Sequence, residues 1–185
     1  MTTAAIFTPR EYRQFGHQLI RLEKHCHEFD ILFSRAYGPG HPLEMVGYTT
    51  CDNGMSKFKH HLSKLAWREY PEMDWDVYFY LLGSREGYNP PNNLPGCTLE
   101  ETQQLSDSLN KRRLNRKHEP LTAEQLAIVV RFYSHVNQTI SAIMCRIQAS
   151  EGDFGTIPEE LSLSAQIILN VLTALQREEQ RVAHE

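Results

Sequence analysis

Histidine and glutamate are the side chains of this 185-residue chain best suited to hold a metal ion, and nine histidines are present. The stretch from His17 to Glu28 gathers three histidines and two glutamates. Di-iron bundles use Glu-x-x-His pairs on facing helices, and zinc proteases use His-Glu-x-x-His. Neither spacing occurs in the sequence. We assign no metal ligand and no cofactor, and keep a metal- or haem-binding bundle around His17, Glu23, His27 and His60 as the second alternative.

A basic run occupies residues 111–118. Its charged residues are Lys111, Arg112, Arg113, Arg116 and Lys117. Such a run would bind the phosphates of RNA or DNA, or an acidic surface on a protein partner. Cations are also favoured near the C-terminus of a helix by the helix dipole, so a structural role stays open beside the functional one. We take these five residues as candidate partner-binding residues.

Within the basic run, Arg113 and His118 are separated by four residues. This Arg-x4-His pattern resembles the motif of the HEPN-domain ribonucleases, which are helical bundles. The resemblance implies that the arginine and the histidine act together on an RNA phosphodiester. The polar residue that usually follows the arginine in that family is replaced here by Leu114. An RNA- or DNA-binding helical protein, with HEPN-like ribonuclease activity at Arg113 and His118, is therefore the first alternative.

Aromatic residues are concentrated between positions 67 and 80. The six are Trp67, Tyr70, Trp75, Tyr78, Phe79 and Tyr80. Such a cluster would form either a ligand pocket or a hydrophobic plug at the end of a bundle, and we expect the plug. The sequence contains no Gly-x-Ser-x-Gly, no Walker loop and no Gly-x-Gly-x-x-Gly. This absence favours a protein without enzymatic activity, and we assign no catalytic residue.

The elements that position these residues follow from hydrophobic periodicity. Apolar residues three and four apart predict helices at 9–37, 55–69, 98–117, 122–150 and 159–182. Helix starts are marked by Thr8 with Pro9 and Glu11, and by capping boxes at Thr98 and Thr122. A strand cannot produce this spacing, so helix should dominate the structure.

Glycine and proline separate the predicted helices. Two stretches rich in these residues, 38–54 and 83–97, predict long loops. Long helices with a period near 3.5 residues favour shallow crossing angles. The expected fold class is therefore all-α, an antiparallel bundle of four to five main helices in a single domain over residues 1–185.

Burial and a docking surface can be predicted from the same pattern. The seam residues expected in the core are Phe15, Leu22, Phe29, Tyr133, Val136, Ile140, Ile143, Ile168, Leu172 and Leu175. The last two helices are apolar beyond one face, and such a helix is either central in its own bundle or covered by a partner. We predict a partner surface that includes Phe132 and Val171, with the basic run at its rim. Folding of the aromatic segment 67–80 over these helices is the competing explanation.

Composition and charge restrict the class of protein. Hydrophobic residues make up 41% and charged residues 23%, and the net charge is −4, so the chain is an ordinary globular protein. No apolar run is long enough to span a membrane, and the start lacks a basic region followed by an apolar stretch. Four widely spaced cysteines fit reduced thiols. These features predict a cytoplasmic location.

The leading functional hypothesis is a non-enzymatic interaction or regulatory protein. It would bind another macromolecule through an exposed helical face and the basic patch, and would form a homodimer or a complex with a different protein. Nucleic acid would bind through residues 111–118, and no membrane association is expected.

Overall fold

The computed structural model describes residues 5–80, 94–114, 118–150 and 154–184, of which 113 and 114 by their backbone alone. The described part is all-α and contains no strand, which confirms the predicted helical-bundle class. Its main helices are α1 (Pro9–Ala36), α3 (Ser56–Glu69), α5 (Leu99–Leu114), α6 (Ala123–Gln148) and α7 (Ile157–Ala183). Three shorter elements are α2 (Val46–Tyr48), the π-helix η1 (Thr49–Met55) and α4 (Asp76–Phe79).

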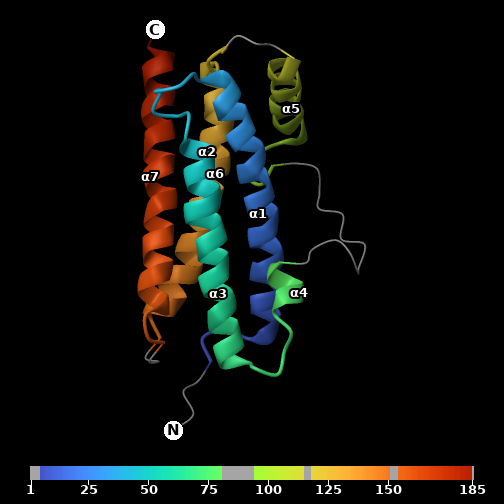
Figure 1. Ribbon diagram of the computed structural model, residues 1–185, viewed down its shortest axis with the longest axis vertical. Helices are drawn as coiled ribbons and strands as arrows, with labels where there is room; N and C mark the ends of the chain where they lie inside the picture. Colours follow the sequence, from blue (N-terminus) through green and yellow to red (C-terminus); the bar gives the residue numbers. More distant parts are fainter. Residues whose placement is uncertain (1–4, 81–93, 115–117, 151–153, 185) are drawn as a thin grey trace.

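Four long helices lie side by side, and α5 stands outside them against α1 (Figure 1). The consecutive helices α6 and α7 run in opposite directions and pack closely on each other (Figure 1). In turn α7 packs on α3, and α3 packs on α1. Within the described part, no helix combines the length and the apolar composition needed to cross a membrane.

Local sequence fixes the starts of α1 and α6 in the predicted way. The Thr8 hydroxyl accepts a hydrogen bond from the Glu11 N–H at 3.3 Å, while the Glu11 carboxylate accepts one from the Thr8 N–H at 2.7 Å. The same reciprocal pair forms between Thr122 and Gln125 at the start of α6. Both boxes satisfy backbone N–H groups that a helix terminus otherwise leaves without partners.

An aromatic layer joins α1 to α6 inside the bundle. The Phe29 ring lies 4.9 Å from the Phe132 ring and 5.8 Å from the Tyr133 ring, between centroids. Phe33 packs beside Phe29 at 6.1 Å. All four side chains are buried, as are the predicted seam residues except Phe15, which is half-buried. The periodicity therefore identified most of the core correctly.

Residues 38–54 differ from the predicted loop, because the chain is helical from Val46 onward and passes through η1 into α3. Gly47 packs against the backbone of Asp30 so closely that a Cβ atom would overlap it. A Cβ atom on Gly54 would lie 2.8 Å from the side chain of Ile168. These glycines permit close approach of helices rather than a turn. Of the other predicted loop, residues 83–93 lie outside the described residues.

Helix α7 is covered by η1 and α3, which both pack on it. The aromatic segment 67–80 packs elsewhere, against the start of α1. Trp75 is fully buried, with its ring 5.5 Å from that of Tyr12. The segment therefore forms a plug at one end of the bundle, although Trp67 and Tyr80 stay exposed.

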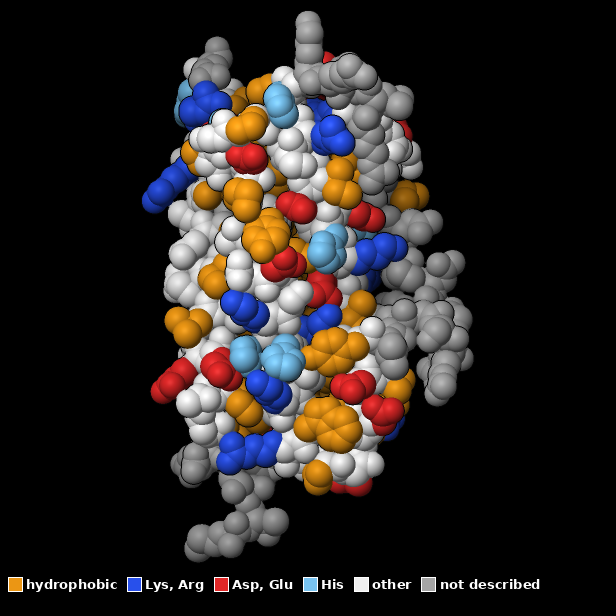
Figure 2. Space-filling view, in the orientation of Figure 1, with side chains coloured by type: hydrophobic (Ala, Val, Ile, Leu, Met, Phe, Trp, Pro, Cys, Tyr) orange, Lys and Arg blue, Asp and Glu red, His pale blue; other side chains and the backbone are white. Residues whose placement is uncertain are grey.

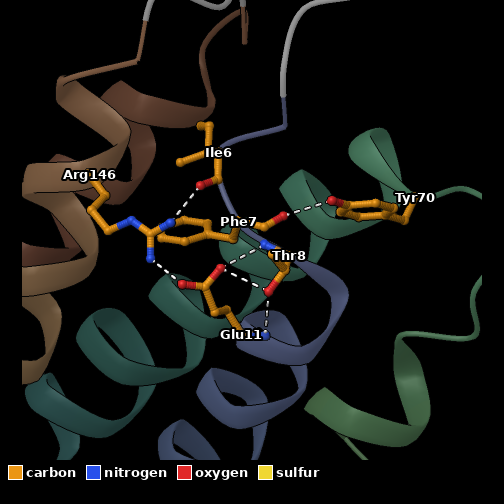
Figure 3. A network of polar contacts seen from close by, with 6 residues as sticks. All are labelled: Ile6, Phe7, Thr8, Glu11, Tyr70 and Arg146. Atoms are coloured by element: carbon orange, nitrogen blue, oxygen red, sulfur yellow. Dashed lines mark hydrogen bonds and ion pairs between the residues drawn. The ribbon is translucent and has the colours of Figure 1, made fainter.

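The residues that precede α1 are tied to two other helices (Figure 3). Arg146 of α6 donates a hydrogen bond to the Ile6 carbonyl at 2.8 Å, and its guanidinium lies 4.4 Å from the centre of the Phe7 ring. Arg146 also forms an ion pair with Glu11. The Tyr70 hydroxyl at the end of α3 donates to the Phe7 carbonyl at 2.9 Å. These contacts fix the start of α1 in the bundle.

Ile140 provides a test of the core. Its side chain is fully buried in α6, so Ile140→Ala removes packed methyl groups and leaves a cavity. We expect the free energy of unfolding to fall by about 2–5 kcal/mol, measured by urea denaturation. Leu163→Ala, at a position 68% exposed on α7, is the control and should stay within about 0.5 kcal/mol of wild type. Equal effects would contradict the assignment of Ile140 to the core.

The Glu11–Arg146 pair predicts an acid dependence. Hydrogen bonds from Arg146 and from the Thr8 backbone lower the pKa of Glu11 from 4.5 to about 2. Because the folded pKa is the lower one, the stabilisation is present above pH 4.5 and is lost as the pH falls through about 2. The stability difference between wild type and Glu11→Gln should therefore shrink over this window, and Arg146→Gln should behave similarly. A difference that stays constant with pH would contradict the pair.

Candidate functional site

The N-terminal end of α5 is fixed to α6 and to the residues that precede α5. The Thr98 N–H donates to the Glu101 carboxylate at 2.8 Å, and the Glu101 N–H donates to the Thr98 hydroxyl at 3.2 Å. Glu101 also forms an ion pair with Arg131 of α6. The Leu94 N–H donates to the Thr102 hydroxyl at 2.9 Å. These contacts anchor the start of α5.

The last turns of α5 are fixed by Arg112, whose side chain is buried. Its guanidinium donates to the Glu119 carbonyl at 3.0 Å, to the Pro120 carbonyl at 3.1 Å, and to the Ser108 hydroxyl. The Gln125 amide donates to the same Ser108 hydroxyl at 3.0 Å. Arg112 therefore satisfies backbone acceptors in the connection to α6 and holds the second end of α5 in place.

Between these two anchors, α5 and α1 enclose a groove of about 480 Å³, which we call the α1–α5 groove. Its apolar lining combines buried Phe29, Leu32 and Leu105 with Leu99, which is 67% exposed. A volume between about 300 and 1,000 Å³ is typical of binding sites. Because both ends of α5 are anchored, the groove exists before any ligand binds.

Polar side chains of the α1–α5 groove come from both helices, and the charged ones come from α1. Arg21, Lys24, His25 and Glu28 line it. The His25 Nδ1 atom lies 2.9 Å from the Glu28 carboxylate, and its ring packs edge-on against Phe132 at 5.9 Å. Hydroxyl and amide groups come from α5, on Thr102, Gln103, Ser106 and Asn110. The groove therefore offers an apolar surface beside two cations, one carboxylate and neutral hydrogen-bonding groups, which suits an amphipathic ligand.

The described residues of the predicted basic patch lie in different environments. Lys111 is exposed, whereas Arg112 is buried and uses its guanidinium within the chain. The side chain of Arg113, and all of Arg116 and Lys117, lie outside the described residues. Arg112 is therefore a structural residue, because its donors are directed at carbonyls of its own chain.

Two further predicted partner residues lie in the core. Phe132 is fully buried in the aromatic layer, and Val171 is 5% exposed on α7. Neither side chain forms an accessible surface, so the predicted partner surface on these residues is replaced by packing within the chain. The wide apolar stripes of α6 and α7 arise because α1, α3 and η1 cover them.

The histidines and the remaining candidates are dispersed. Glu23 accepts hydrogen bonds from Ser56 and from the buried Lys59, while His60 bonds the Tyr80 hydroxyl at 3.1 Å. The His17 ring lies against that of Tyr78, and His27 is exposed. Among the described residues, no group of three or more histidines, cysteines or acids is arranged to hold a metal ion. The four residues of the metal hypothesis do not converge.

The HEPN-like pair falls partly outside the described residues, because the Arg113 side chain is not among them. His118 is exposed and its ring lies beside Gly38. A Cβ atom added to Gly38 would lie 3.3 Å from that ring.

Sequence reasoning missed the α1–α5 groove. Its signal was the spacing of Arg21, Lys24, Glu28 and Leu32 on one face of α1, opposite the sparse leucines of α5. That pattern is also typical of a helix face exposed to solvent. Only the observed pairing of α1 with α5 shows that this face lines a groove.

Comparison with known proteins adds no relative. The chain matches no protein-family model, no curated protein and no solved structure. The function of this helical bundle with a preformed groove therefore has to be argued from the groove itself.

Arg112 and Lys111 give a matched pair of variants. Arg112→Ala leaves the Glu119 and Pro120 carbonyls without their charged donor, so the free energy of unfolding should fall by roughly 2–4 kcal/mol. Lys111→Ala, the exposed neighbour, should change it by less than about 0.5 kcal/mol. Urea denaturation measures both, and similar effects of the two substitutions would show that the Arg112 anchor is not needed.

Proposed function

We propose that this chain is a non-enzymatic interaction protein that binds an amphipathic helix of a protein partner in the α1–α5 groove. The observation that carries the proposal is the groove itself, a preformed space of about 480 Å³ lined by apolar side chains, by the cations Arg21 and Lys24, and by one acid, Glu28. A groove that needs no rearrangement spends little binding free energy on ordering. The proposal includes a regulatory role in the cytoplasm, in keeping with the lack of catalytic motifs in the sequence.

The dimensions of the groove support a helical partner. Along α1 it extends from Arg21 to Leu32, and along α5 from Leu99 to Asn110. At 1.5 Å per residue each wall is about 16 Å long, which corresponds to three turns of a docked helix. A helix of this length presents an apolar stripe at positions i, i+3, i+4 and i+7, as in other helix-in-groove complexes.

The charges support an acidic partner. The cations Arg21 and Lys24 line the groove together with one acid, Glu28, whose carboxylate lies 2.9 Å from the His25 ring. Lys111 follows directly after Asn110 at the other end. Acidic residues on the polar edge of the docked helix would meet these cations, which favours one orientation and speeds association. Figure 2 shows that hydrophobic side chains on the face in view are interspersed with acidic and basic ones.

The test of this proposal compares substitutions at two leucines that are nearly equally exposed. Leu99 is 67% exposed beside the groove, and Leu163 is 68% exposed on α7. Immobilised wild-type protein, Leu99→Asp, Lys24→Glu and Leu163→Asp are incubated with nuclease-treated lysate, and retained proteins are quantified by mass spectrometry. We expect one protein to be retained by wild type and Leu163→Asp and reduced at least about tenfold by both groove variants.

Other occupants give different outcomes of this experiment. A parallel incubation uses untreated lysate, and a protein retained there but not from the nuclease-treated lysate would replace the protein partner by nucleic acid. If the retained protein is the chain itself, and size-exclusion chromatography shows a dimer that Leu99→Asp dissociates, a second copy occupies the groove. Equal retention by all four proteins, or retention of no protein, would overturn the proposal.

A further inference from the structure

The outer face of α3 carries a row of basic and imidazole side chains. They recur at i, i+3, i+4, i+7 and i+11, a spacing that places them on one face of the helix. The row consists of Lys57, His60, His61, Lys64 and Arg68. Figure 2 shows histidine and basic side chains gathered along this part of the surface. We call these five residues together with Trp67 the α3 stripe, which is about 16 Å long at 1.5 Å per residue.

The cations of the α3 stripe are not used inside the bundle. Lys57, Lys64 and Arg68 are exposed, and none of them forms an ion pair with a residue in the described part of the chain. The acid of α3, Glu69, does not neutralise them, because its carboxylate accepts a hydrogen bond from the Tyr12 hydroxyl of α1 at 2.9 Å. The three cations therefore face solvent with their charge available to an anionic partner.

Two exposed aromatic rings lie among these cations. Trp67 is 38% exposed and follows Lys64 by one turn of α3. Tyr80 is 43% exposed, and its hydroxyl lies 3.1 Å from the His60 Nδ1 atom and 3.1 Å from the Ser63 hydroxyl, which holds the ring beside α3. Cations combined with exposed rings suit single-stranded nucleic acids, because bases stack on the rings while the cations contact phosphates.

Acidic side chains border the α3 stripe on both sides. On α7, the Glu160 carboxylate lies 2.9 Å from the His61 Nδ1 atom. On α4, Asp76 is exposed beside Tyr80: burial raises the pKa of the Tyr80 hydroxyl, and the nearby Asp76 carboxylate raises it further. The cationic surface is therefore only one helix wide. A duplex would bring a second row of phosphates against these acids, whereas a single strand can follow the stripe.

We infer that the α3 stripe binds single-stranded nucleic acid, with Lys57, Lys64 and Arg68 contacting phosphates and Trp67 stacking on a base. None of these residues lines the α1–α5 groove, so the inference concerns a second surface and does not depend on the protein partner proposed above. The net charge of the chain is −4, so the rest of the molecule gives no general attraction for phosphates. Binding then depends on the stripe and falls steeply with salt.

The test measures binding of fluorescein-labelled oligothymidylate and oligouridylate to the full chain by fluorescence anisotropy at several salt concentrations. On a single strand each neutralised phosphate contributes about −0.7 to the slope of log K against log salt, so three cations predict a slope of about −2. Lys64→Gln/Arg68→Gln should weaken binding at least about tenfold and reduce the slope to about −0.7. The control Arg10→Gln/Arg35→Gln removes two exposed arginines of α1, and it should keep the slope and bind within about twofold of wild type.

Trp67 distinguishes nucleic acid from an acidic protein partner. Trp67→Ala should weaken oligonucleotide binding at least about fivefold, whereas Trp67→Phe, which keeps a ring for stacking, should retain most of it. Circular dichroism checks the fold of each variant, and the Lys64/Arg68 double variant decides the question if Trp67→Ala does not fold. Absence of saturable binding at low salt, unchanged binding by a folded Trp67→Ala protein, or equally weakened binding by the α1 control would overturn the inference. Competition by polyglutamate as strong as that by the unlabelled oligonucleotide would also overturn it, in favour of an acidic protein.

Discussion

The aromatic layer between α1 and α6 sets the spacing on which the rest of the bundle depends. Phe29, Phe132 and Tyr133 meet with ring centroids 4.9–5.8 Å apart, and large rigid rings hold two helices at a distance that smaller side chains would not. The layer also reaches the α1–α5 groove, because Phe29 lines it and His25 packs edge-on against Phe132. The groove beside α1 is therefore a consequence of how the core is packed.

Buried charge is the second constraint, because an ion removed from water must be paired or hydrogen-bonded. Lys59 meets this requirement through Glu23, and Arg112 meets it through carbonyls of the connection between α5 and α6. Arg112 belongs to the basic run that was predicted to bind a partner, and Lys59 lies next to His60 of the metal hypothesis. Their role in the structure is to fix helices in place, and in the case of Arg112 this keeps α5 over the groove.

The α1–α5 groove combines buried apolar side chains such as Phe29 and Leu105 with charged and neutral polar groups. Its charged lining residues include the cations Arg21 and Lys24 and the acid Glu28. An amphipathic helix is the ligand that we propose for this lining. The outer helix α5, which forms one wall, is held at both of its ends by hydrogen bonds to neighbouring parts of the chain.

The sequence by itself determined the five long helices, because capping boxes such as Thr8 with Glu11 and apolar spacing are local properties of the chain. It also identified core residues such as Ile140, since a residue on an apolar stripe has to be buried by some neighbour. Only the tertiary structure decided that Gly47 permits close helix packing instead of a turn, and that Arg112 faces inward. Only the tertiary structure paired α1 with α5. These outcomes depend on contacts between residues far apart in the chain, and local periodicity carries no information about which helices become neighbours.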